Sequence, residues 1–144
     1  MIIETDYLGK IEIDPCNIIK FEHGIPGFEE EKEFILLSID EQSAFQMLQS
    51  VNNHTLAFVV IDPAYIILDY SFNLEESIVH SLEIQEEQEV AVYSIVSLKD
   101  TIPNSTINLK APIIINKTNN KAKQVILDKE EYTTRHRIGT ERGV

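Results

Sequence analysis

The fold of this chain is limited most by a series of short runs that are rich in β-branched and aromatic residues. Residues 56–61 are the clearest run, because all six are apolar and Asp62-Pro63 ends them. Runs of this length and composition are typical of β-strands. The other strand-like runs are residues 34–39, 44–50, 89–98, 106–110, 113–116 and 124–127.

The N-terminal residues predict a hairpin. Ile3, Thr5 and Tyr7 alternate with polar residues, and Ile11 and Ile13 do so after a glycine. The turn is expected at residues 8–10. The spacing of all these runs, with turn signals between them, favours antiparallel strands over alternating strands and helices. The expected fold is mainly β: a compact antiparallel β-barrel-like or sandwich-like domain with one short helix.

The helix is expected after Asn73. Asn73 can cap a helix and Glu76 follows three residues later, which matches a capping box. Leu74, Ile78 and Leu82 then fall at i, i+4 and i+8 on one face. We expect this helix to pack on the strands and to carry no chemistry.

A chain of 144 residues is most simply one domain, and a domain of this size can bury a core without metals or disulfides. Residues 1–128 hold all the strand-like runs and are expected to form the β-barrel-like domain. Residues 129–144 are polar and are expected to form a mobile tail.

A cytoplasmic location is expected. Cys16 is the only cysteine, which indicates a reducing compartment. The N-terminus lacks the basic and apolar regions of a signal peptide. The longest apolar run is far below the ~20 residues that a membrane helix needs.

The net charge of −12 is unevenly distributed. Residues 1–98 carry three lysines against 19 acids, whereas residues 99–144 carry nine basic residues against five acids. An acidic body repels nucleic acid and attracts basic proteins. Solubility alone explains the same charge equally well.

The sequence offers little for catalysis. None of the four histidines has the spacing of a zinc site, and no phosphate-binding glycine loop or nucleophile elbow is present. The two glutamate clusters, residues 29–33 and 83–89, could bind calcium or act as acid–base pairs, but charge runs are usually solvated faces. We expect no enzymatic activity and no cofactor.

Residues 21–28 form the most distinctive motif, Phe-Glu-His-Gly-Ile-Pro-Gly-Phe. Two glycines and a proline set a sharp backbone path between two aromatic residues. Phe21 and Phe28 are most simply anchors of a structural loop. Ile25 and Pro26 are the better interface candidates, because an apolar tip beside acidic residues is unusual for a loop with no partner.

This motif and several others resemble the flagellar assembly factor FliW family. The matching segments follow the same order over almost the whole chain, and the turn at residues 24–28 together with Asn-Leu-Lys-Ala-Pro at residues 108–112 is specific. The segments are residues 2–9, 21–28, 34–37, 48–50, 57–58, 62–63, 108–116, 122–127 and 132–138.

The resemblance implies a non-enzymatic β-barrel-like protein with two protein partners. Members of this family bind flagellin in the cytoplasm and also bind CsrA, an RNA-binding translational regulator. CsrA held by the family member cannot block flagellin translation, and unexported flagellin captures the family member and frees CsrA. This partner switch requires neither direct nucleic-acid binding nor a membrane.

We assign candidate partner-binding residues on this basis. An apolar groove for a flagellin segment would use Ile25, Pro26, Phe28, Phe45 and Met47, although Phe45 and Met47 could instead face the core. Glu29, Glu30, Glu31 and Glu33 would oppose RNA beside bound CsrA. Two alternatives remain open: an acidic β-barrel that serves as chaperone or subunit for another basic protein, and a metal-dependent enzyme.

Overall fold

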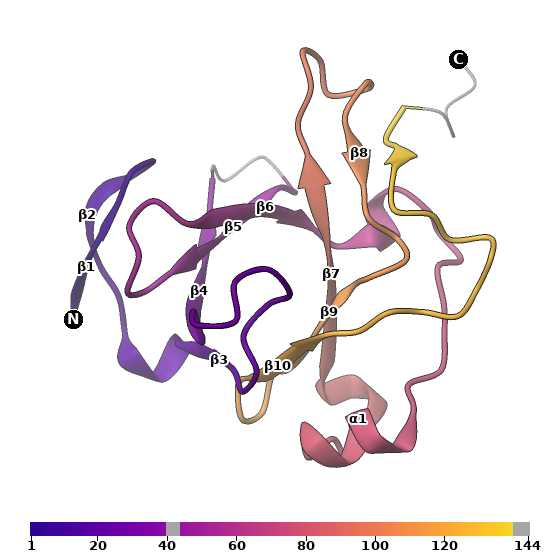
Figure 1. Cartoon of the computed structure of the whole chain (residues 1–144), viewed down its shortest axis with the longest axis horizontal. Helices are drawn as coiled ribbons and strands as arrows, with labels where there is room; N and C mark the ends of the chain where they lie inside the picture. Colours follow the sequence, from indigo (N-terminus) through magenta and orange to yellow (C-terminus); the bar gives the residue numbers. More distant parts are fainter. Residues whose placement is uncertain (40–43, 140–144) are drawn as a thin grey trace.

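Seven strands close into a barrel in the computed structural model, which describes residues 1–39 and 44–139 (Figure 1). The ring runs β7-β6-β5-β4-β3-β10-β9 and closes because β9 also pairs with β7. Its strands are β3 (Ile19–Phe21), β4 (Glu33–Ser38), β5 (Gln46–Ser50), β6 (Ala57–Ile61), β7 (Val90–Ser97), β9 (Ile113–Asn116) and β10 (Lys121–Gln124). Neighbours are antiparallel except β3 and β10, which are parallel. The expected mainly β, barrel-like fold is therefore confirmed.

Side chains alternate between the two faces of each strand, so apolar residues form one core inside the barrel and another outside it. On β7, Ala91 and Tyr93 pack inside the barrel, whereas Val90 and Val92 pack outside it. β9 is buried on both faces, which explains its unbroken Ile-Ile-Ile run. The barrel therefore needs a second layer of chain to cover its outer apolar residues.

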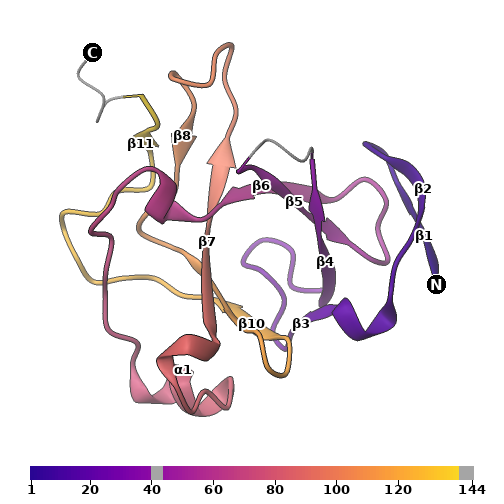
Figure 2. The same ribbon diagram turned by 180° about the vertical axis from the view of Figure 1, so that it is seen from behind.

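The outer layer consists of the remaining elements (Figure 2). The hairpin of β1 (Ile2–Thr5) and β2 (Gly9–Glu12) packs Ile3 against Ile35 of β4. Elsewhere the layer contains α1 (Glu76–Ser81), β8 (Thr106–Ile107) and β11 (His136–Arg137). The short 3₁₀ turns are η1 (Pro15–Asn17), η2 (Pro63–Tyr65) and η3 (Glu87–Glu89). No helix in the described residues is long and apolar enough to cross a membrane.

The helix exists, but it begins later than predicted. Glu75 is its N-cap residue, and its side chain makes no capping hydrogen bond. Phe72 and Leu74, two residues apart, both pack against the outer core, so the chain before Glu75 runs past the barrel without starting a helix. The capping box of this region lies instead at Glu86 and Glu89.

Strand prediction failed at three places. β3 and β11 were not expected, because three and two residues are too few to give a periodic pattern. β10 was expected at residues 124–127 but spans Lys121–Gln124. The predicted run continues as a segment bonded to the residues just before β9, since the Val125 and Leu127 N–H groups donate to the Pro112 and Lys110 carbonyls.

Residues 129–139 belong to the expected tail, and they contact the rest of the chain at Tyr132 and β11. The Tyr132 side chain is buried, and its hydroxyl donates to the Ser71 carbonyl and accepts from the Ser71 N–H, both at 3.0 Å. β11 pairs with β8. The remainder of the expected tail, residues 140–144, lies outside the described residues.

Candidate partner-binding surfaces

The turn at residues 21–28 closes one end of the barrel. The β3–β4 connection lies across the middle of the strand ring in both views (Figures 1 and 2). Ile25 packs in the inner core with Phe21 and is only 2% exposed. Ile25 is therefore a core residue, and its assignment as an interface residue was wrong. Apolar interior space at the barrel end explains why the Ile25 side chain points inward.

Gly24 gives this turn its tight path. Its φ is +69°, and a Cβ at this position would lie 2.6 Å from the Glu29 backbone. Only glycine accepts both constraints. The turn then closes with a hydrogen bond from the Phe28 N–H to the Ile25 carbonyl at 2.7 Å.

Pro26 and Phe28 remain on the surface of the turn. Phe28 is 42% exposed and packs edge-on against Phe58, with ring centroids 5.5 Å apart. Pro26 is thus exposed as expected, whereas Phe28, which the sequence suggested is most simply an anchor of the loop, lies at the surface. Phe28 and Phe58 form a small apolar surface beside the acidic residues.

The four glutamates of this region divide into two pairs. Glu29 and Glu30 are exposed, and the Gly27 N–H donates to the Glu29 carboxylate, which lowers its pKa. Glu31 accepts from the Ser50 hydroxyl at 3.0 Å, and Glu33 accepts from an Asn52 side chain. Glu31 and Glu33 are thus tied to the end of β5, and Glu29 and Glu30 project from the turn.

Phe45 and Met47 do not join Pro26 and Phe28 in one exposed groove. Met47 is 4% exposed, and Phe45 is half-buried against the outer core. Leu48 packs in the inner core, so its neighbour Met47 points to the opposite, outer face of β5. Phe45, two residues before Met47, lies on the same outer side. The prediction that these residues are accessible is wrong for Met47, and Phe45 lies in a different cluster from the turn.

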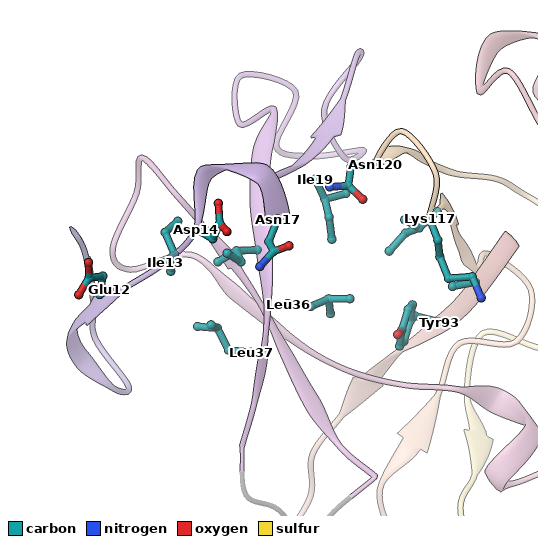
Figure 3. Close-up of a pocket in the computed structure, with 13 residues that line it drawn as sticks. Glu12, Ile13, Asp14, Asn17, Ile19, Leu36, Leu37, Tyr93, Lys117 and Asn120 are labelled. Carbon is teal, nitrogen blue, oxygen red and sulfur yellow. The ribbon is translucent and has the colours of Figure 1, made fainter. Parts of the chain in front are cut away.

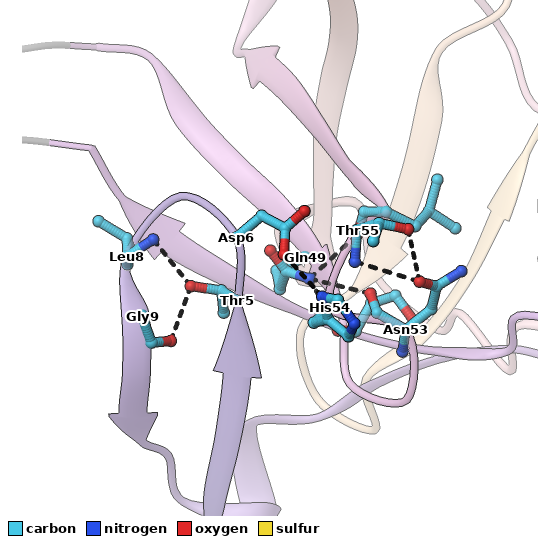
Figure 4. A network of polar contacts seen from close by, with 10 residues as sticks. Thr5, Asp6, Leu8, Gly9, Gln49, Asn53, His54 and Thr55 are labelled. Atoms are coloured by element: carbon cyan, nitrogen blue, oxygen red, sulfur yellow. Dashed lines mark hydrogen bonds and ion pairs between the residues drawn. The ribbon is translucent and has the colours of Figure 1, made fainter.

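A second surface lies where the β1–β2 turn meets the β5–β6 turn (Figure 4). The Asp6 N–H donates to the His54 carbonyl at 3.0 Å, and His54 Nδ1 lies 2.6 Å from an Asp6 carboxylate oxygen. This hydrogen bond raises the pKa of His54. Beside the contact lies a cleft of about 260 Å³ lined in part by Tyr7, Met47 and Phe58. The contact joins residues 48 positions apart, so no local pattern predicted it.

The other end of the barrel opens into a cavity of about 410 Å³ (Figure 3). It lies near the start of β3, whereas the turn that closes the barrel follows the end of β3. Leu36 and Tyr93 line it from the barrel strands, and Lys117 and Asn120 lie at its rim. Burial raises the pKa of the Tyr93 hydroxyl. No group of three potential metal-ligating side chains occurs within residues 1–39 and 44–139.

Comparison with known proteins agrees with the fold. The model of the family described as "FliW protein" matches residues 2–138. A flagellar assembly factor FliW of Oceanobacillus iheyensis is 48% identical over 138 residues, which cover 96% of this chain and 94% of that protein. The corresponding factor of Bacillus subtilis is 47% identical over 141 residues, covering 98% and 99%.

A solved structure gives the same result in three dimensions. The crystal structure of a flagellar assembly factor FliW superposes with a TM-score of 0.90 at 43% identity and covers 96% of each chain. Sequence and fold therefore agree over almost the full length. This chain belongs to the FliW family.

Proposed function

We propose that this chain is a cytoplasmic flagellar assembly factor that binds flagellin and the translational regulator CsrA in turn. The family match over residues 2–138, with relatives named as flagellar assembly factors over nearly their whole length, carries the proposal. A binding role also suits the exposed apolar ring of Phe28 and the exposed carboxylates of Glu29 and Glu30 beside it.

The flagellin surface is proposed around Phe28. Pro26 and Phe28 are exposed, and Phe58 supports the Phe28 ring. A disordered amphipathic segment of flagellin can order itself on such an apolar surface. Ile25 contributes from below, because it anchors the turn in the inner core. Phe28→Ala should weaken flagellin binding more than it lowers the free energy of unfolding.

We propose that the acidic surface lowers the affinity of bound CsrA for RNA. Glu29 and Glu30 carry the exposed charge, and a tenfold change in RNA affinity corresponds to only about 1.4 kcal/mol of coupling. Reversal of both charges to lysine should strengthen messenger binding by the CsrA complex while CsrA affinity changes little. Reversal of the exposed Glu130 and Glu131 is the matched control. Equal loss of CsrA binding and antagonism would contradict this role.

Calorimetry with purified partners tests the proposal as a whole. The chain is titrated with CsrA, and flagellin is then added to the preformed complex. Binding of each protein alone and displacement of CsrA by flagellin are expected. If neither protein binds at micromolar concentrations, the function is a different one, and the acidic chaperone or subunit becomes the better explanation.

A further inference from the structure

A hollow without an assigned role lies on the outer side of β7, beside α1 (Figure 1). Its volume is about 650 Å³. Three parts of the chain line it: the outer face of β7, residues 70–74, and α1 with the turn that follows the helix. All the lining residues fall within residues 70–92, so this hollow is separate from the Phe28 surface and from Glu29 and Glu30.

Apolar side chains around this hollow are only partly covered. Phe72 and Leu74 contact the outer core but are not fully buried, and Asn73 between them is exposed. Val90 and Val92 are partly buried in the same way on β7. The apolar lining includes Tyr70, Phe72, Leu74, Ile84, Val90 and Val92. Contact with a partner would remove this apolar surface from water, which is favourable.

The charge around the hollow is of one sign. Glu86 and Glu87 line it, and no lysine or arginine does. Neither glutamate forms an ion pair within the described residues. Residues 62–98, which supply the whole lining, carry eight acidic residues and no lysine or arginine. The hollow is therefore acidic as well as apolar.

Lysines from neighbouring parts of the fold do not balance this charge. Lys129 donates to the Ser71 carbonyl at 3.0 Å, so its ammonium group is already hydrogen-bonded. Lys121 pairs with Glu83 after the end of α1. Lys117 lines the cavity at the open end of the barrel instead. An excess of carboxylates remains beside the apolar lining, which favours an occupant that carries positive charge.

We propose that this hollow binds an amphipathic helix of a partner protein, with apolar side chains on one face and lysine or arginine beside them. The apolar side chains contact Leu74 and Val92, and the cationic groups meet Glu86 and Glu87. Because three separate elements line the hollow, a cluster of side chains fits it better than a single row. A helix presents such a cluster at i, i+3, i+4 and i+7.

This inference goes beyond the proposed function, because the site shares no residue with the two surfaces assigned above. Its test uses neither flagellin nor CsrA, so failure of either proposal leaves the other standing. The partner is defined by its chemistry, which a designed peptide can reproduce.

The probe is an acetylated, amidated peptide of about 14 residues, long enough to form a helix when bound, with leucine at i, i+3, i+4 and i+7 and with lysine and alanine elsewhere. It is titrated into the isotope-labelled full chain and followed by NMR. Shifts are expected at residues 70–74 and 84–92. Two control peptides should bind at least about tenfold more weakly: one of the same composition in scrambled order, and one with glutamate in place of lysine. Equal affinity of either control, shifts centred elsewhere, or no shifts at millimolar probe would overturn the proposal.

One pair of variants tests the charge. Glu87→Lys should weaken the probe about fivefold at low salt, and the difference should disappear near about 1 M salt, where charges are screened within about 3 Å. Glu12→Lys is the matched control, since it changes the net charge equally on the exposed side of the β1–β2 hairpin, away from α1 (Figure 1). Its effect should stay within about twofold. Equal effects of the two substitutions would refute a local role of the carboxylates.

A second pair tests the apolar contact. Leu74→Ala should weaken the probe about fivefold, whereas Leu98→Ala, at a 54% exposed position outside the hollow, should change the affinity less than about twofold. Circular dichroism checks that each variant folds. Unchanged affinity in a folded Leu74→Ala variant would contradict binding in the hollow. If this variant does not fold, the scrambled peptide decides the same question.

Discussion

Ile25→Ala should destabilise the protein strongly, because Ile25 fills the closed end of the barrel. The side chain is 2% exposed and packs in the inner core. Removing three buried carbons costs about 2.4 kcal/mol at roughly 0.8 kcal/mol each. Gly24 and the hydrogen bond that closes the turn prevent the loop from collapsing into the space, so a residual cavity of about 40 Å³ adds about 1 kcal/mol. The expected loss is about 3.4 kcal/mol.

Urea denaturation followed by circular dichroism measures this loss. Ile126→Ala is the matched control, since the same substitution at a 75% exposed position should cost less than about 0.5 kcal/mol. The melting temperature of Ile25→Ala should fall by roughly 10 °C. A loss below about 1 kcal/mol, or a loss equal to that of the control, would refute the assignment of Ile25 to the core.

Three further perturbations test other parts of the structure. Gly24→Ala should lower the melting temperature far more than Gly9→Ala. Both glycines have positive φ, but a Cβ at Gly24 would lie 2.6 Å from the Glu29 backbone, whereas a Cβ at Gly9 would meet open space. Asp6 raises the pKa of His54, so their contact stabilises the fold at acidic pH and this stabilisation is lost as the pH rises through the raised pKa. Asp6→Asn should remove this pH dependence from the urea midpoint of unfolding. It should also lower the pKa of His54 measured by NMR. Asn116→Ala should cost about 2 kcal/mol in urea denaturation, because the buried Asn116 amide donates to two carbonyls at the end of α1.

Local patterns predicted much of the fold for a clear physical reason. Strands such as β6 and β9 consist almost wholly of apolar residues, so their composition identifies them, and the alternation on β7 agrees with its inner and outer contacts. Closure of the barrel was not predictable in the same way. It depends on β3 and β10, short strands whose parallel pairing joins Lys20 to Lys121 across about a hundred residues. Short strands that are interrupted by lysine, as both of these are, resemble loops in sequence.

Prediction of the candidate surfaces from the sequence was limited in the same way. The turn motif was found because its glycines and proline are consecutive, but the direction of Ile25 depends on the barrel around it. The Asp6–His54 contact joins two turns that are 48 positions apart in the chain. In each case residues far apart in the chain meet only through strand pairing, which periodicity does not specify.

Fluorescence anisotropy of a labelled flagellin messenger fragment tests the central claim most directly. CsrA should raise the anisotropy, addition of this chain should lower it, and subsequent addition of flagellin should raise it again. That order follows if one acidic barrel serves the two proteins in turn. A messenger that stays bound to CsrA at saturating concentrations of this chain, or a release that flagellin cannot reverse, would contradict the account.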